Sequence, residues 1–181
     1  MTLGQGRETR LGRRQPYRES QTTILVGANG KKTEQDYFRA LKDESWTRPF
    51  ILEFKNKAPA DLLDWGYTEK CNSGYDEVFC VSNVDNFAVN SNTIAQATAY
   101  GVGLALSKPC FDFWLLLHLK DCKKPFQNAD EVGRELKKII PKWDKTMLNF
   151  ADFKSGVFDA SNRAKSLGDP PKPTPPHPCG N

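Results

Sequence analysis

The sequence predicts an α/β protein in which a mainly parallel sheet is flanked by helices. Segments typical of strands alternate along the chain with segments typical of helices, an order that produces parallel sheets with helical crossovers. Residues 77–82 form a short continuous apolar run, as expected for a central strand that is covered on both faces. The length of 181 residues suits one domain, and 38% hydrophobic with 27% charged residues is ordinary globular usage.

The first half of the chain contains the repeating unit of such a fold. Thr33 is a candidate N-cap for the first helix. The alternation of Ile51 and Glu53 with Leu52 and Phe54 predicts a second strand with one solvated side. The predicted elements of this half are a strand at 22–27, a helix at 34–42, a strand within 49–58, a helix at 59–71 and a strand at 77–82.

The second half continues the alternation and then becomes helical. Pro109 stands where proline is favoured, at the first position of a helix that is mostly core. An irregular aromatic stretch precedes the last helix. The predicted elements of this half are a helix at 91–101, a strand around 103–106, and helices at 109–121, 129–139 and about 159–167.

The two ends of the chain differ in composition from its middle. Residues 1–20 have few large apolar side chains, so we expect a flexible basic arm that cannot offset its ordering entropy by burial. Its arginines suit contact with nucleic-acid phosphates, a solvated tail being the alternative. The arm's candidate nucleic-acid ligands are Arg10, Arg13 and Arg14. Residues 169–181 form a proline-rich tail that should end the fold, which leaves 21–168 as the folded domain.

Two features bear on location. No apolar run reaches the ~18 residues needed to span a bilayer, and the arginine-rich start lacks the hydrophobic core of a secretory signal. We therefore expect a cytoplasmic protein without a membrane partner. The five cysteines lack paired CxxC spacing, which predicts reduced thiols rather than a disulfide framework or a zinc knuckle.

Three polar segments should meet at the carboxyl ends of the predicted parallel strands, where α/β proteins gather ligands. They read GANGKKTE, SNVDNF and LSKPCFDFW, and they contain Glu34, Asp85 and Asp112. These carboxylates are candidates for one acidic cluster. Because clustered carboxylates repel one another, such a cluster favours binding of Mg²⁺ or Mn²⁺. The alternative is that these residues only cap helices.

The same region offers other polar side chains. Lys31 and Lys32 are well placed for phosphate beside a strand–helix turn, or are simply solvated. Asp112 also has a simpler explanation, as a polar residue near a helix start, where the helix dipole favours it. His118 lies in an apolar helix, and we interpret it as a core or surface histidine rather than a ligand or general base.

At these residues the sequence resembles the RloB-like family, prokaryotic proteins of the TOPRIM nuclease class. The family is associated with antiviral defence by abortive infection and is often encoded beside an AAA-type ATPase. The likeness covers roughly residues 13–167 and is carried by RRQPYRESQTTILV, GKKTEQDYF, VDNF and, most specifically, ALSKPCFDFWLLLHL. The resemblance implies a TOPRIM-like, Rossmann-like fold and a role in defence against phage.

The sequence departs from the family's motifs at two carboxylates. The first motif usually reads like CEGEKTE; Glu34 matches its last residue, but Asn29 stands at its first acidic position. The second motif normally has two aspartates flanking one residue, whereas here Asn83 precedes Asp85. The third commonly has glutamate where this chain has Asp112. An asparagine neither accepts a proton at neutral pH nor supplies negative charge, so the resemblance implies a weakened metal site and weakened acid–base chemistry.

The resemblance leaves three alternatives for function. The chain is an attenuated Mg²⁺- or Mn²⁺-dependent nuclease, a catalytically silent protein that binds DNA or RNA, or an assembly subunit for an AAA-type ATPase. The implied metal ligands are Glu34, Asp85, Asp112, Asn83 and Asn29, and the implied catalytic residues are Glu34, Asp85, Asp112 and Lys32. Lys31 joins the arginine arm as a candidate nucleic-acid ligand.

Overall fold

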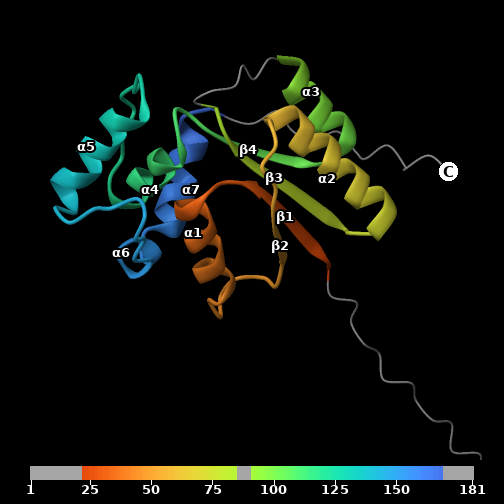
Figure 1. Ribbon diagram of the computed structural model, residues 1–181, viewed down its shortest axis with the longest axis horizontal. Helices are drawn as coiled ribbons and strands as arrows, with labels where there is room; N and C mark the ends of the chain where they lie inside the picture. The colour runs from red at the N-terminus through yellow and green to blue at the C-terminus, as the bar shows by residue number, and fades with distance from the viewer. Residues whose placement is uncertain (1–21, 85–90, 169–181) are drawn as a thin grey trace, which may run out of the picture.

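A four-stranded parallel sheet forms the centre of the protein in the computed structural model (Figure 1). The structure describes residues 22–84 and 91–168. The strands lie in the order β2-β1-β3-β4, and all three neighbouring pairs are parallel. Their bounds are Ile24–Asn29 for β1, Ile51–Phe54 for β2, Glu77–Asn83 for β3 and Gly103–Ser107 for β4. The predicted α/β architecture is confirmed, and all four strands end at one edge, which we call the carboxyl edge.

Helices cover both faces of the sheet. Helices α2 and α3 lie on one face, and α1 lies on the other beside a helical group formed by α4 to α7 (Figure 1). The bounds are Lys32–Lys42 for α1, Pro59–Ser73 for α2, Ser91–Tyr100 for α3, Phe111–Leu119 for α4, Ala129–Ile139 for α5, Ala151–Lys154 for α6 and Val157–Ser166 for α7. Within the described ranges, no helix has the length and apolar character needed to cross a bilayer.

The alternation of side chains along each strand decides which face a polar residue meets. Leu25 and Val78 pack on the α2 face, whereas Val81 belongs to the opposite, α1 face. Successive side chains of a strand point to opposite faces. Asn29, four residues after Leu25, therefore faces α2, and Asn83, two residues after Val81, faces α1. The two asparagines at the carboxyl edge thus point to opposite sides of the sheet.

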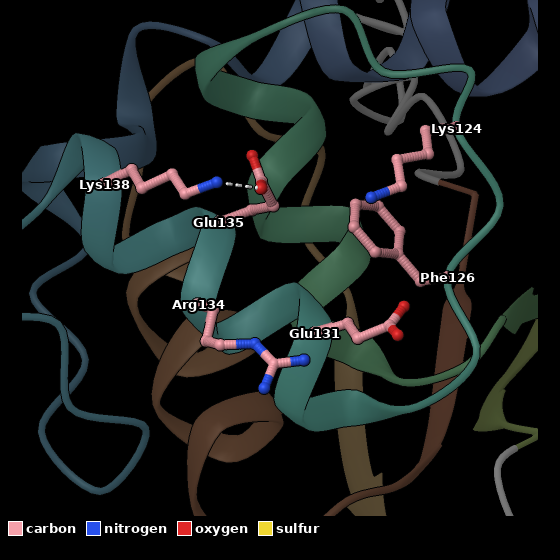
Figure 2. Close-up of a pocket in the computed structure, with 6 residues that line it drawn as sticks. All are labelled: Lys124, Phe126, Glu131, Arg134, Glu135 and Lys138. Atoms are coloured by element: carbon pink, nitrogen blue, oxygen red, sulfur yellow. Dashed lines mark hydrogen bonds and ion pairs between the residues drawn. The ribbon is translucent and has the colours of Figure 1, made fainter.

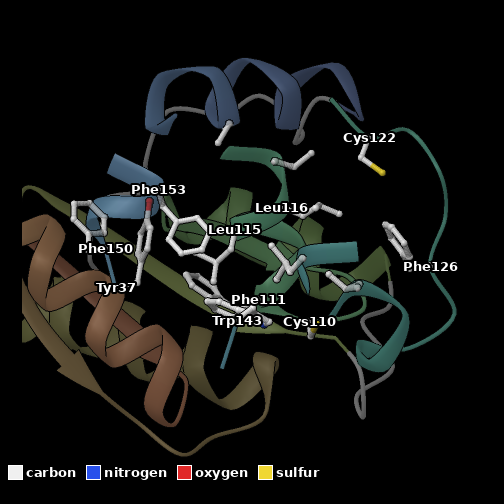
Figure 3. Packing of buried hydrophobic residues seen from close by; sticks show 14 residues of the cluster. Tyr37, Cys110, Phe111, Leu115, Leu116, Cys122, Phe126, Trp143, Phe150 and Phe153 are labelled. Carbon is white, nitrogen blue, oxygen red and sulfur yellow. The ribbon is translucent and has the colours of Figure 1, made fainter. Parts of the chain in front are cut away.

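The larger hydrophobic core joins α1 to the helical group rather than to the sheet (Figure 3). Tyr37 of α1 lies in its middle and makes edge-to-face contacts with Phe111 and Phe150, with ring centroids 5.3 Å apart in both pairs. Such aromatic pairs contribute about 0.5–1.5 kcal/mol each beyond the area they bury. This core fixes the start of α4, and with it Asp112, relative to α1.

His118 is a satisfied core histidine. Its Nδ1 lies 2.8 Å from the carbonyl oxygen of Trp114, and its Nε2 lies 3.0 Å from the hydroxyl of Tyr37. Because a carbonyl can only accept, Nδ1 carries the proton and Nε2 accepts from Tyr37. Burial lowers the pKa of His118, which keeps the ring neutral. The interpretation of His118 as a structural residue is therefore supported, and the ring is already fully used in the core.

Three local predictions were wrong. Thr33 is not a cap: α1 begins at Lys32, and the Thr33 hydroxyl is buried and donates to the carbonyl oxygen of Lys145 at 2.6 Å. Pro109 does not start α4, because the helix begins at Phe111, after Cys110 in an extended conformation. Cys71 is disulfide-bonded, so the expectation of reduced thiols fails for that residue.

Two glycines provide a matched test of how α7 packs. A Cβ at Gly156 would lie 2.1 Å from the backbone oxygen of His118, whereas a Cβ at Gly133 in α5 would meet no atom within 4 Å. We expect Gly156→Ala to displace α7 and lower the free energy of unfolding by about 1–3 kcal/mol. Gly133→Ala should raise it by about 0.5–1 kcal/mol through helix propensity. Urea unfolding measures both, and equal stability of Gly156→Ala and the wild type would contradict the close approach.

Candidate functional site

The carboxyl edge brings together three of the predicted site residues. Glu34 comes from the first turn of α1, Asn83 from the end of β3, and Asp112 from the first turn of α4. Asn83 hydrogen-bonds to Glu34, and the charge of Glu34 acts on Asp112. Segments distant in sequence thus form one polar site, as the parallel topology predicts.

Glu34 is held in place by the shape of the β1–α1 turn. Its side chain is only 8% exposed. A Cβ at Gly30 would lie 2.3 Å from the Cβ of Glu34, so only glycine leaves room for this close approach. The negative charge lies in the first turn of α1, where the helix dipole stabilises an anion. The turn therefore orients a buried carboxylate towards the end of β3.

Asn83 satisfies one oxygen of this buried carboxylate. The Asn83 amide nitrogen donates to Glu34 Oε1 at 2.7 Å. The amide nitrogen faces Glu34 because an ionised carboxylate can only accept hydrogen bonds. An aspartate at position 83 would instead place a second negative charge against Glu34. The asparagine thus stabilises the site without a cation.

The pKa of Asp112 reflects its burial and its closeness to a second carboxylate. Its pKa is raised to about 6, mainly by burial and also by the nearby charge of Glu34, while the charge of Lys145 partly opposes both. Asp112 also lies in the first turn of α4, where the helix dipole favours the charged form. Since the pKa is raised nonetheless, desolvation and repulsion outweigh the dipole and the lysine.

Lys145 is the site residue that sequence reasoning missed. Its charge acts on Asp112 and on Asp144, and its backbone oxygen accepts the hydrogen bond from Thr33. The Thr33 bond ties the loop before α6 to the residue that precedes Glu34. In the sequence, Lys145 is one lysine in a polar turn, and no local pattern distinguishes it from other surface lysines.

Asn29 does not join this group through any of its hydrogen bonds. Its amide nitrogen donates to the backbone oxygen of Lys57 and lies 3.4 Å from the Ser82 hydroxyl, both on the α2 side of the sheet. A role for Asn29 as a neutral metal ligand stays a prediction.

The remaining predicted residues divide into exposed lysines and positions that the structure does not describe. Lys32 pairs with Asp36 along α1 at 2.9 Å. Lys31 is exposed at the N-terminus of α1. Asp85 and the arm residues lie outside the described residues, so their predicted roles stay predictions; the arm residues are Arg10, Arg13 and Arg14.

The donor chemistry of the site suits a hard divalent cation. Glu34 and Asp112 supply carboxylate oxygens that repel one another, and Asn83 supplies an amide oxygen, the donor types that Mg²⁺ and Mn²⁺ prefer. Among residues 22–84 and 91–168, however, no group of three His, Cys, Asp or Glu side chains gathers closely enough to hold a metal ion. The described part of the site therefore offers fewer anionic ligands than the family motifs imply.

A separate pocket of about 260 Å³ beside α5 does not compete with this site (Figure 2). Glu135 in that pocket forms ion pairs with Lys120 and Lys138. Hydrogen bonds from Lys120, which has the larger effect, and from Lys138 lower the pKa of Glu135 to about 2. Its lining residues are Lys124, Phe126, Glu131, Arg134, Glu135 and Lys138. Among the described residues, none of these side chains forms a hydrogen bond or ion pair with Glu34, Asn83 or Asp112, so the pocket is separate from the carboxyl edge site.

Fold and site together define an α/β protein with a polar site at the carboxyl edge of a parallel sheet. The family model for RloB-like proteins matches residues 24–181, which is most of the chain. The chain belongs to the RloB-like family. The match starts later and ends later than the likeness at roughly residues 13–167 that the motifs indicate. No curated protein and no solved structure matches the chain.

Replacing Asp112 by asparagine should stabilise the protein at high pH. The pKa of Asp112 is about 6 in the folded state and 3.8 in the unfolded state. Between these pH values the folded state binds more protons than the unfolded state, so the free energy of unfolding falls as the pH rises through about 6. At about 1.4 kcal/mol per unit of pKa, Asp112→Asn should raise the free energy of unfolding at pH 8 by up to about 3 kcal/mol. At pH 4 the difference should shrink, which urea unfolding in a chelator measures.

Asp61 provides the control for this prediction. It is an exposed carboxylate in the first turn of α2. Asp61→Asn should slightly destabilise the protein at pH 8, because it removes a charge that the helix dipole favours, worth about 0.3–1 kcal/mol. Asp112→Asn could instead lower the free energy of unfolding at pH 8 by the same amount as Asp61→Asn. That result would show that the folded protein does not disfavour the charged form of Asp112.

Proposed function

We propose that the protein is an attenuated TOPRIM-type, metal-dependent nuclease that cleaves nucleic-acid phosphodiester bonds. The observation that carries the proposal is the meeting of Glu34, Asn83 and Asp112 at the carboxyl edge. These residues belong to the three motifs in which the sequence resembles TOPRIM proteins. Membership of the RloB-like family fits a defence-related role.

Each described residue has a part in this proposal. Glu34, Asp112 and the amide oxygen of Asn83 are the groups that would hold Mg²⁺ or Mn²⁺. A bound ion of this kind polarises a phosphate oxygen and offsets charge that develops during cleavage. Asp85 would add a further carboxylate.

Attenuation follows from the asparagines. Asn83 contributes no negative charge, which weakens the attraction of the site for a cation. Its amide also donates a hydrogen bond to Glu34 at 2.7 Å, which weakens that attraction further. Asn29 cannot take a proton at neutral pH. The loss of a positioned acid–base group typically lowers a rate by ~10²–10⁴-fold. Cleavage by this chain is therefore proposed to be slow.

A catalytically silent binding protein is the second candidate. The Glu34–Asn83 hydrogen bond favours it, because that bond stabilises the buried carboxylate without any cation. Such a protein would bind DNA or RNA through the carboxyl edge and the arginine arm, or would serve as the subunit that engages an AAA-type ATPase. It would show salt-sensitive binding or copurification with the ATPase, and no cleavage.

The test is cleavage of a mixed panel of DNA and RNA by the purified chain in Mn²⁺, Mg²⁺ or chelator. Alongside it, Asn83→Asp and the double variant Asn29→Glu/Asn83→Asp restore the family carboxylates. We expect slow, Mn²⁺-dependent cleavage by the wild type and a gain of ~10²-fold or more in the double variant. If neither protein cleaves any substrate, the nuclease proposal is wrong and the binding function replaces it.

Asn83→Asp should also change how stability responds to metal. Without metal, loss of the hydrogen bond to charged Glu34 should lower the free energy of unfolding by about 1.5–3 kcal/mol. With Mn²⁺ at about 100 times the Kd, binding should restore about 2.7 kcal/mol. For a chain of this size that corresponds to a rise in Tm of roughly 5–10 °C. Thermal unfolding with Mn²⁺ and with chelator measures both effects.

Asn29→Asp is the matched control. It makes the same chemical change at a residue whose amide faces Lys57 and Ser82 rather than Glu34. If the cation is held only on the Glu34 side of the sheet, Asn29→Asp should destabilise the protein without any added response to Mn²⁺. A Mn²⁺ response equal to that of Asn83→Asp would instead show that position 29 contributes to the cation site.

A further inference from the structure

A set of lysines without ion pairs surrounds the acidic site at the carboxyl edge. All of them are exposed, and none has a carboxylate within 4.0 Å among the described residues. We call this set the lysine rim; its members are Lys31, Lys57, Lys108 and Lys145. Five lysines outside the rim are paired with carboxylates, namely Lys32, Lys55, Lys120, Lys138 and Lys154. Others without an ion pair, such as Lys42, are set apart from the rim by their position in the chain.

Lys31 and Lys57 follow β1 and β2 at the same edge. Lys31 directly precedes α1 and stands three residues before Glu34. The backbone oxygen of Lys57 accepts a hydrogen bond from the Asn29 amide at the end of β1. The two lysines are thus tied to the neighbouring strands that form one half of the edge.

Lys108 lies at the far end of the edge, and Lys145 lies beside α1. Lys108 follows Ser107, the last residue of β4, which is paired in register with Asn83. Lys145 is held by the hydrogen bond from Thr33 to its backbone oxygen, at 2.6 Å, and its charge acts on Asp112. The rim therefore extends from the end of β2 to the end of β4 and includes a lysine close enough to act on Asp112.

We infer that the lysine rim binds successive phosphates of one nucleic-acid strand and lays that strand across the acidic site. The inference rests on the proposed function and adds the path of the substrate. From β2 to β4 the edge spans three strand spacings, about 14 Å. Such a span is long enough for more than one phosphate of a strand, each of which carries a negative charge.

The spread of the cations favours a strand over a small anion. A single phosphate or carboxylate could reach only neighbouring donors, whereas these lysines arise from separate strand ends and from the loop before α6. Lysine is a point charge with freely rotating donors and reads phosphate without selecting a base. The rim therefore supplies affinity and position but no sequence preference.

The experiment measures binding in the absence of cleavage. Fluorescence anisotropy of labelled DNA and RNA single strands of about 12 nucleotides is recorded for the full chain in chelator across a salt series. Each phosphate contact contributes about 0.7 to the slope of log K against log salt for a single strand. We expect Lys57→Ala, Lys108→Ala and Lys145→Ala each to lower the slope by about 0.7–1.

Lys42→Ala is the matched control. Lys42 is an exposed lysine, also without an ion pair among the described residues, in the last turn of α1. The helix places it roughly 15 Å from the carboxyl edge, at 1.5 Å of rise per residue. Its removal should leave the slope unchanged, because it lies far from the proposed path of the strand.

The outcomes separate the rim from the proposed function. Lower slopes in the rim variants, with Lys42→Ala unchanged, support the rim whether or not the chain cleaves. Equal slopes in rim and control variants, or no binding by the wild type, overturn it. Mn²⁺-dependent cleavage with unaltered slopes rejects the rim alone, and altered slopes without cleavage reject the nuclease alone.

Discussion

The shared direction of the four strands is the constraint on which the site depends. Because every neighbouring pair is parallel, each strand ends at the carboxyl edge and each following loop starts there. The period of two along a strand then decides the face that each terminal side chain meets. Asn83 reaches Glu34 on the α1 face, while Asn29, at the same edge, bonds to the backbone of Lys57 on the α2 face. Whether a motif residue joins the site therefore depends on the face of the sheet that it meets as well as on its place in the motif.

A second requirement is that α1 and α4 keep a fixed relation. Glu34 and Asp112 lie in the first turns of these helices, and no strand pairing holds the two helices together. The aromatic core does so, with Tyr37 of α1 packed against Phe111 of α4 and bonded to His118. The buried histidine thus serves the site by holding its framework, although it takes no part in the chemistry.

The sequence was sufficient for the fold and for part of the site. Alternating strands and helices predict a parallel sheet, and such a sheet places Glu34 and Asp112 at one edge whatever the details of packing. The opposite directions of Asn29 and Asn83 could not be predicted, because they depend on the register that pairs Asn29 with Ser82 rather than with Asn83.

Contacts between distant loops could not be predicted in this way. Thr33 has the residue type and place of an N-cap, yet its hydroxyl bonds to Lys145, a residue far along the chain. Local propensity describes what a residue can do within its own turn, and a buried hydroxyl takes whichever acceptor tertiary packing provides. Lys145 was missed for the same reason, because only the folded chain brings its charge near Asp112.

The balance of charge explains what stabilises the acidic pair in the described site. Two carboxyl groups that are partly shielded from water repel each other. The pKa of Asp112 is raised mainly by its burial and also by this repulsion. Asn83 removes what would be another negative charge and donates to Glu34, and Lys145 supplies a compensating positive charge. The substitution that weakens the attraction for a divalent ion is therefore the one that lets the acidic pair persist in its absence. Three of the surrounding lysines, Lys31, Lys57 and Lys108, have no carboxylate within 4.0 Å among the described residues and therefore remain available to an external anion.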